Sequence, residues 1–196
     1  IGALNEAFVQ DRRNKSAHDS VEEFRQVTQR SLERLAALDD DEWERVGWSP
    51  EGEAPYHRFM ETRLLDSWIH LQDIRDGLTM PSDDHGVGEE VVLNRFEAAL
   101  PYVIGKRAQA PEGSRIRVNI TGRLARTTDI VVRDGRAVAA DTAGEPLLEI
   151  TTPAAIFWRR AAGRITAAAF LEASATDVRG DRDIARRIAE GLAIMI

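Results

Sequence analysis

The spacing of apolar residues changes once along this 196-residue chain, near residue 110. Before that point apolar side chains recur at steps of three and four, which is typical of amphipathic helices. From about residue 115 to 152 they alternate with polar residues, as they do in half-buried strands. Helical spacing then returns. This order predicts an α+β protein, with helices first and then a small α/β domain that contains an antiparallel sheet.

The first part predicts three main helices, over about residues 20–38, 56–76 and 89–107. Ser20 and Glu23 have the spacing of a capping box at the start of the first helix. Turn-forming residues predict a loop before the second helix: Pro50, Gly52 and Pro55. Gly77 is the expected C-cap of the second helix. Pro101 is expected to kink or split the third, because proline has no N–H to donate.

The second part predicts strands over about residues 115–122, 125–133, 137–140 and 147–151. The Asp134–Gly135 pair is a strong signal for a hairpin turn between two of them. A helix is expected after the last strand, with Thr152 as N-cap, Pro153 at its first position and Gly163 at its end. A final helix should begin near Asp181. The segment 110–113 predicts a division into domains 1–110 and 111–196.

Composition excludes several classes of function. Lys and Arg number 26 against 33 Asp and Glu, a net charge of −7 that disfavours nucleic-acid binding. No apolar run is long enough to span a membrane. The absence of cysteine excludes disulfides, thiolate zinc sites and a cysteine nucleophile, and it suits a cytoplasmic protein. Only Lys15 and Lys106 are lysines, and such dominance of arginine is typical of a high-GC bacterium.

A polar stripe lies along the second predicted helix, where Arg63, Asp66, His70 and Asp73 are three, four and three residues apart. Residues at these steps share one side of a helix. Asp66 and His70 therefore place a carboxylate and an imidazole on adjacent turns, where both can bind one divalent metal ion. Asp73 could orient the His70 ring without binding the metal itself, and so fix which ring nitrogen faces the metal.

Simpler interpretations stand beside these. An Asp–His pair at this spacing is also a common surface contact. Trp68 is either a core residue or a platform for substrate, and Arg63 and Arg75 either bind a carboxylate of the substrate or form surface ion pairs. The other histidines lie near loops or caps and are expected to be solvated: His18, His57 and His85.

The segment Asp66–Arg75, followed by Gly77 and Pro81, resembles the signature of the mycothiol-dependent maleylpyruvate isomerase-like family. Members of that family contain a DinB-like metal-binding helical bundle. Residues 157–159 and 180–185 resemble the small C-terminal α/β domain of the same family, which is related to sterol carrier proteins.

The resemblance implies an antiparallel bundle that holds a divalent metal, usually zinc, through three side chains. Two of them correspond to Asp66, where many members have Glu, and His70. The third is a histidine on an earlier helix. Residues 1–13 resemble the stretch that follows this helix, and the chain begins without Met, so the third ligand is expected on N-terminal sequence outside this chain, which would contain only part of the bundle.

The resemblance also implies mycothiol as a cosubstrate, which adds to an activated double bond of a small molecule. The predicted partners are thus a small-molecule substrate and a thiol, in a monomer or homodimer. The predicted function is a metal-dependent, thiol-dependent isomerase or transferase. The alternatives are a non-catalytic small-molecule-binding or regulatory module that retains the fold, and a stable relic without activity.

Two features of the C-terminal part leave alternatives open. Arginines cluster beside Trp158, and they either close over an anionic substrate or form a solvated helix end: Arg159, Arg160 and Arg164. The apolar run over residues 167–171 suits the wall of a ligand cavity or an ordinary core.

Overall fold

The computed structural model describes residues 2–50, 52–83, 86–140 and 144–195. Its residues form two compact units, 1–60 and 61–196, which divide within helix α4 (Tyr56–Gly77). Helices and two sheets confirm the predicted α+β class. The domain boundary near residue 110 stays a prediction. Within the described residues, no helix is long and apolar enough to cross a membrane.

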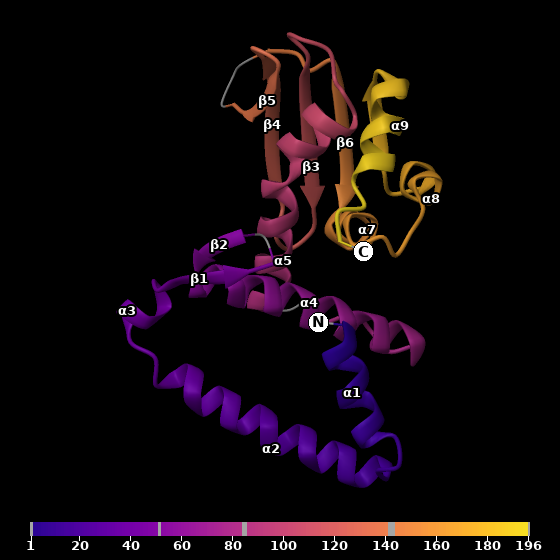
Figure 1. Ribbon diagram of the computed structural model, residues 1–196. Coiled ribbons are helices and arrows are strands. Elements are labelled where there is room, and N and C mark those ends of the chain that lie inside the picture. Colours follow the sequence, from indigo (N-terminus) through magenta and orange to yellow (C-terminus); the bar gives the residue numbers. More distant parts are fainter. Residues whose placement is uncertain (1, 51, 84–85, 141–143, 196) are drawn as a thin grey trace. The chain divides into compact units, whose positions relative to one another are not determined.

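The first unit contains three helices and a short hairpin, followed by the first residues of α4 (Figure 1). The helices are α1 (Gly2–Arg12), α2 (Ala17–Ala36) and α3 (Asp40–Trp43). The hairpin consists of two antiparallel strands, β1 (Val46–Ser49) and β2 (Gly52–Pro55). Strand β1 lies just before the segment predicted as a loop, and β2 lies within it. Helix α2 has the predicted amphipathic pattern, but none of its residues is buried.

The predicted capping box at Ser20 is wrong. Helix α2 starts one turn earlier, at Ser16, whose hydroxyl accepts a hydrogen bond from the Asp19 N–H at 3.1 Å. Glu23 instead pairs with basic side chains before α2, which donate stronger, charge-assisted hydrogen bonds. A true capping box forms at α3, where the Asp39 and Glu42 side chains each accept from the other residue's backbone N–H.

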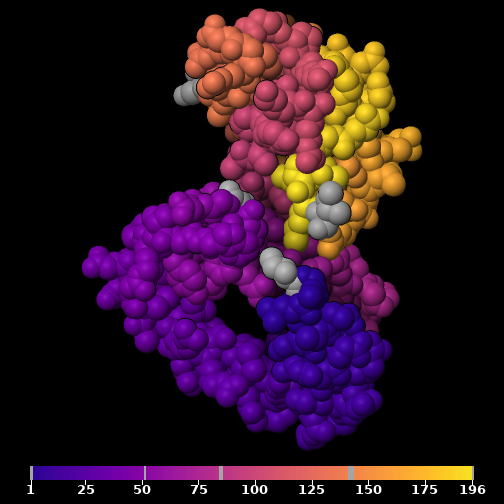
Figure 2. Space-filling model, in the orientation of Figure 1, coloured from indigo at the N-terminus to yellow at the C-terminus, as the bar shows by residue number. Residues whose placement is uncertain are grey.

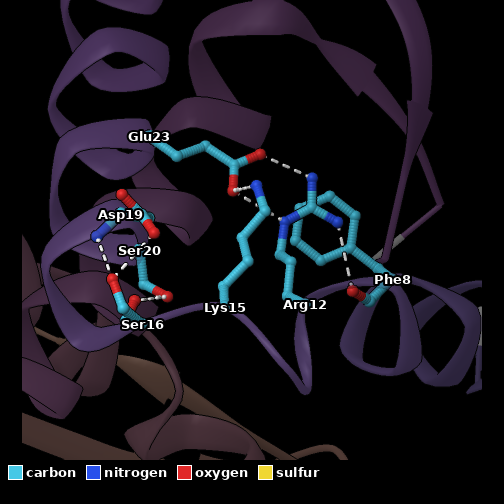
Figure 3. Close-up of polar contacts among 7 residues, drawn as sticks. All are labelled: Phe8, Arg12, Lys15, Ser16, Asp19, Ser20 and Glu23. Atoms are coloured by element: carbon cyan, nitrogen blue, oxygen red, sulfur yellow. Dashed lines mark hydrogen bonds and ion pairs between the residues drawn. The ribbon is translucent and has the colours of Figure 1, made fainter.

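The Glu23 carboxylate fastens α1 to α2 (Figure 3). The Arg12 guanidinium donates to both of its oxygens, at 2.7 and 3.1 Å, and lies 3.3 Å from the centre of the Phe8 ring. Lys15 Nζ donates to one of the same oxygens at 2.7 Å. Hydrogen bonds from Arg12 and then Lys15 lower the pKa of Glu23 to about 2.

This pairing predicts how the α1–α2 junction responds to acid. Because the pKa of Glu23 in the folded chain lies below the ordinary value of 4.5, the stabilisation is complete above pH 4.5 and is lost as the pH falls through about 2. NMR titration of the Glu23 carboxyl carbon should give a midpoint near 2. Arg12→Met should raise that midpoint. Arg25→Met should not, because Arg25 pairs with Glu22. An ordinary midpoint in the unchanged chain would contradict the assignment.

The second unit begins within α4 and continues through three helical segments. These are α5 (Val87–Ala98), α6 (Leu100–Tyr102) and the π-helical turn η1 (Val103–Arg107). Pro101 lies where the predicted third helix is split, as expected. The predicted C-cap at Gly77 is wrong: α4 includes Gly77, and the residue with left-handed backbone is Thr79, with φ of 55°.

A five-stranded sheet has the order β5-β4-β3-β6-β7. Its strands are β3 (Arg115–Thr121), β4 (Arg126–Arg133), β5 (Arg136–Ala139), β6 (Leu148–Pro153) and β7 (Asp177–Gly180). The Asp134–Gly135 turn is confirmed, with φ values of 53° and 70°. The sheet is not wholly antiparallel as predicted, because β3 and β6 pair in parallel. The edge strand β7 was missed, since only Val178 in it is buried.

The remaining helices are α7 (Ala154–Ala161), α8 (Ala167–Glu172) and α9 (Arg182–Gly191). Both α7 and α9 contact the sheet at β6 (Figure 1). Figure 2 shows α9, in yellow, on the surface of this unit. Strand β6 runs through Pro153, so Thr152 is not a helix cap, and its hydroxyl lies 2.9 Å from that of Thr176. Helix α9 begins next to Asp181, as predicted, and the Asp181 side chain caps it. Phe170, in the apolar run with two interpretations, is a core residue with 1% of its surface exposed.

Candidate functional site

The polar stripe of α4 forms in the second unit as the spacing predicts. The imidazole of His70 lies between two carboxylates of the same helix. Its Nε2 is 3.5 Å from Asp66 Oδ1, and its Nδ1 is 3.2 Å from Asp73 Oδ2. The His70 side chain is 60% exposed, so the stripe is open to molecules from solution.

Asp73 has a second partner that the sequence did not predict. Arg164, just after α7, donates from Nε to Asp73 Oδ1 at 3.0 Å and from Nη2 to Oδ2 at 2.6 Å. These hydrogen bonds are the main cause that lowers the pKa of Asp73, and burial opposes them. The same pair raises the pKa of Arg164. An ionised carboxylate can only accept hydrogen bonds, so the Nδ1 of His70 must carry the proton that is shared with Asp73.

The separation of Asp66 and His70 fits two ligands of one metal ion. Tetrahedral zinc, with bonds of about 2.0–2.2 Å, places two of its ligand atoms about 3.4 Å apart. The 3.5 Å between His70 Nε2 and Asp66 Oδ1 matches this separation, and both atom types are common zinc ligands. Within the described residues, however, no group of three His, Cys, Asp or Glu side chains could hold a metal. The site thus fits zinc in atom type and spacing but lacks a third ligand.

The other candidate residues have different surroundings. Trp68 is 6% exposed and contacts Trp158 edge to face, with ring centres 5.1 Å apart, which supports the interpretation as core. Arg75 Nε donates to the carbonyl of Pro81 at 2.7 Å and so holds the turn after α4. Arg63 is exposed on α4.

The two other histidines among the described residues lie in the first unit. His18 is exposed on α2. His57 is half-buried in the first unit, with Nδ1 3.3 Å from Glu44 Oε1, and so is less solvated than predicted. His85 lies outside the described residues.

Each arginine of the cluster near Trp158 has a fixed set of partners. Arg159 donates to both oxygens of Asp76, at 3.1 and 3.2 Å. Arg160 is 7% exposed and donates to backbone carbonyls of α9, including that of Ala189 at 2.7 Å, and burial lowers its pKa. Arg164 holds Asp73. The cluster is therefore not a solvated helix end.

These observations define a class of protein: an α+β chain whose long helix presents an acid–histidine pair with metal-ligand spacing, joined to a mixed five-stranded sheet. Residues 1–75 match the family model described as the mycothiol maleylpyruvate isomerase N-terminal domain. The match includes Asp66, His70 and Asp73, and it confirms the resemblance predicted from this segment. A comparison with curated proteins finds no match.

Solved structures of the sterol carrier type are similar to about half of the chain. A UbiJ-SCP2 ubiquinone synthesis protein is 14% identical, with a TM-score of 0.40, over 53% of this chain and 95% of its own. Sterol carrier protein 2 like 2 from Aedes aegypti is 16% identical, with a TM-score of 0.38, over 52% and 93%. Sterol carrier protein 2 from Yarrowia lipolytica is 12% identical, with a TM-score of 0.38, over 52% and 87%. At these values the likeness transfers no ligand to this chain.

The packing of Trp68 predicts that Gly88, on α5, tolerates no side chain. A Cβ at Gly88 would lie 2.5 Å from Trp68 Cδ1, so either the indole or α5 would have to move. Gly88→Ala should lower the free energy of unfolding by about 1–3 kcal/mol, the usual cost of overpacking. Gly77→Ala is the matched control, because its Cβ would meet no atom within 4 Å. Thermal unfolding of both variants tests this, and equal stabilities would contradict it.

Proposed function

We propose that this chain belongs to a thiol-dependent isomerase or transferase that acts on a small electrophile, with mycothiol as cosubstrate. In this proposal Asp66 and His70 provide two ligands of a divalent metal ion, most simply zinc. The observation that supports it best is the 3.5 Å separation of His70 Nε2 and Asp66 Oδ1, on a helix within the segment that matches the maleylpyruvate isomerase family model.

The residues around His70 suit it for this role. Because Nδ1–H donates a hydrogen bond to Asp73, the neutral imidazole has its lone pair on Nε2, which lies 3.5 Å from Asp66 Oδ1 and is the atom that would bind the metal. The third ligand would come from beyond the described residues, and the family resemblance points to a histidine on a preceding helix. When bound, zinc would favour the thiolate form of a thiol at neutral pH. The chain needs no cysteine for this, because the cosubstrate supplies the sulfur.

One observation favours a second candidate function. The described residues supply two ligands where a catalytic zinc site needs at least three. A small-molecule-binding or regulatory module that keeps the fold without thiol chemistry would need no third ligand. Such a module should bind its ligand equally well after treatment with a chelator.

Metal analysis of the protein at its full natural length tests the proposal. We expect about one zinc ion per chain in protein purified without chelators. Asp66→Ala and His70→Ala should each lose it, whereas Ser67→Ala, at an exposed position of the same helix, should retain it. Mycothiol-dependent conversion of maleylpyruvate should be lost in the same two variants. Metal retained by both variants would contradict the proposed ligands, and a metal-free wild-type protein would favour the binding module.

A further inference from the structure

The geometry points to Arg164 as a positioning residue for the candidate site. Through Asp73 it fixes the orientation and the protonated nitrogen of the His70 ring. This inference rests on the proposed function for the role of His70. It adds a residue that lies far outside the segment matched by the family model.

Arg164 is itself held in place, which a positioning residue requires. Gly163, with φ of 74°, ends α7 and turns the chain so that Arg164 follows directly. The Arg164 backbone N–H donates to the carbonyl of Arg159 at 2.7 Å. Its Nη1 donates to the carbonyl of Ala162 at 2.6 Å, while Nε and Nη2 donate to the carboxylate of Asp73. The guanidinium is thus fixed to the end of α7 on one side and to α4 on the other.

Both oxygens of Asp73 are occupied in this arrangement. Oδ1 accepts from Arg164, and Oδ2 accepts from Arg164 and from His70 Nδ1. A fork of two parallel hydrogen bonds fixes the plane of the carboxylate as well as its position. The acceptor for His70 is therefore presented in one direction, and the ring turns its Nε2 toward Asp66. Without Arg164 the Asp73 side chain would be free to rotate away from His70.

The chain offers a matched control for this role. Arg159, on α7, also pairs with an aspartate of α4, because its Nη2 donates to both oxygens of Asp76, one turn further along α4. Both arginines are mostly buried, with side chains 21% and 25% exposed. Among the described residues, Asp76 forms no hydrogen bond or ion pair with His70, whereas Asp73 lies 3.2 Å from His70 Nδ1. Loss of either arginine removes one link between α4 and α7, and only loss of Arg164 should affect His70.

The first experiment needs no metal. Long-range ¹H–¹⁵N NMR of the metal-free protein in alkaline buffer distinguishes the two neutral forms of each imidazole, and a His70→Gln spectrum identifies the His70 signals. We expect the Nδ1–H form in the wild type and in Arg159→Gln. Arg164→Gln should give a mixture of both forms, and Arg164→Lys, which keeps the charge but not the fork, should be intermediate.

The second experiment measures affinity for Co²⁺ and Zn²⁺ in the same variants at full natural length. Changes of residues that orient metal ligands typically weaken binding by about 10–100-fold. We expect a loss of this size in Arg164→Gln and wild-type affinity in Arg159→Gln. Unchanged or tighter binding in Arg164→Gln, or an equal loss in both variants, would overturn the inference and leave only a role in docking the helices.

The two experiments separate the inference from the function on which it rests. If the wild-type protein binds no metal, the proposed ligand role fails, and the NMR spectra still test whether Arg164 fixes His70. If metal binds but the His70 signals in Arg164→Gln match the wild type, the proposed function stands and the role of Arg164 is refuted.

Discussion

The contact between Trp68 on α4 and Trp158 on α7 is the interaction on which the candidate site depends. Both rings are almost wholly buried, and their edge-to-face geometry brings the two helices together in the core of the second unit. Aromatic side chains bury a large apolar surface, and this contact buries two indoles at once. Because Trp68 faces inward, the residues two before and two after it, Asp66 and His70, lie on the opposite, solvent-exposed side of α4.

The arginine–aspartate bridges beside this contact have a different role. Their side chains are between 21% and 47% exposed, and partly exposed ion pairs add little to stability. Their contribution is direction, most of all at Arg164, whose fork of Nε and Nη2 binds the Asp73 carboxylate in only a few orientations. The apolar contact therefore sets the distance between α4 and α7, and the bridges set the rotation of the polar side chains at its edge. Arginine performs a related task at the end of α9, where Arg107 donates to the carbonyls of Gly191 and Ala193 at 2.8 Å.

The parts of the structure that the sequence predicts well are local. The Asp66–His70–Asp73 geometry follows from the repeat of one helix, and the Asp134–Gly135 turn follows from the backbone that two residues prefer. Errors arose where a distant or competing partner decided the outcome. Glu23 does not form the predicted capping box, because its carboxylate accepts stronger hydrogen bonds from Arg12 and Lys15. The parallel pairing of β3 with β6 depends on the path of the chain between the two strands. The alternation of apolar and polar residues within a strand does not indicate its direction relative to a neighbour.

Arg164 shows the same limit at the site itself. It lies 91 residues after Asp73, and no periodicity connects positions so far apart. The segment that matches the family model ends at residue 75, before every residue of α7 and before the arginines that hold Asp73 and Asp76. The matched segment contains the acid–histidine pair, but it contains neither Trp158 nor Arg164, which binds Asp73. The orientation of His70 therefore depends on the fold of the chain through α7 and Arg164. A helix with the same ten residues in another protein would have the same spacing of Asp66, His70 and Asp73, but nothing would fix the orientation of the histidine ring.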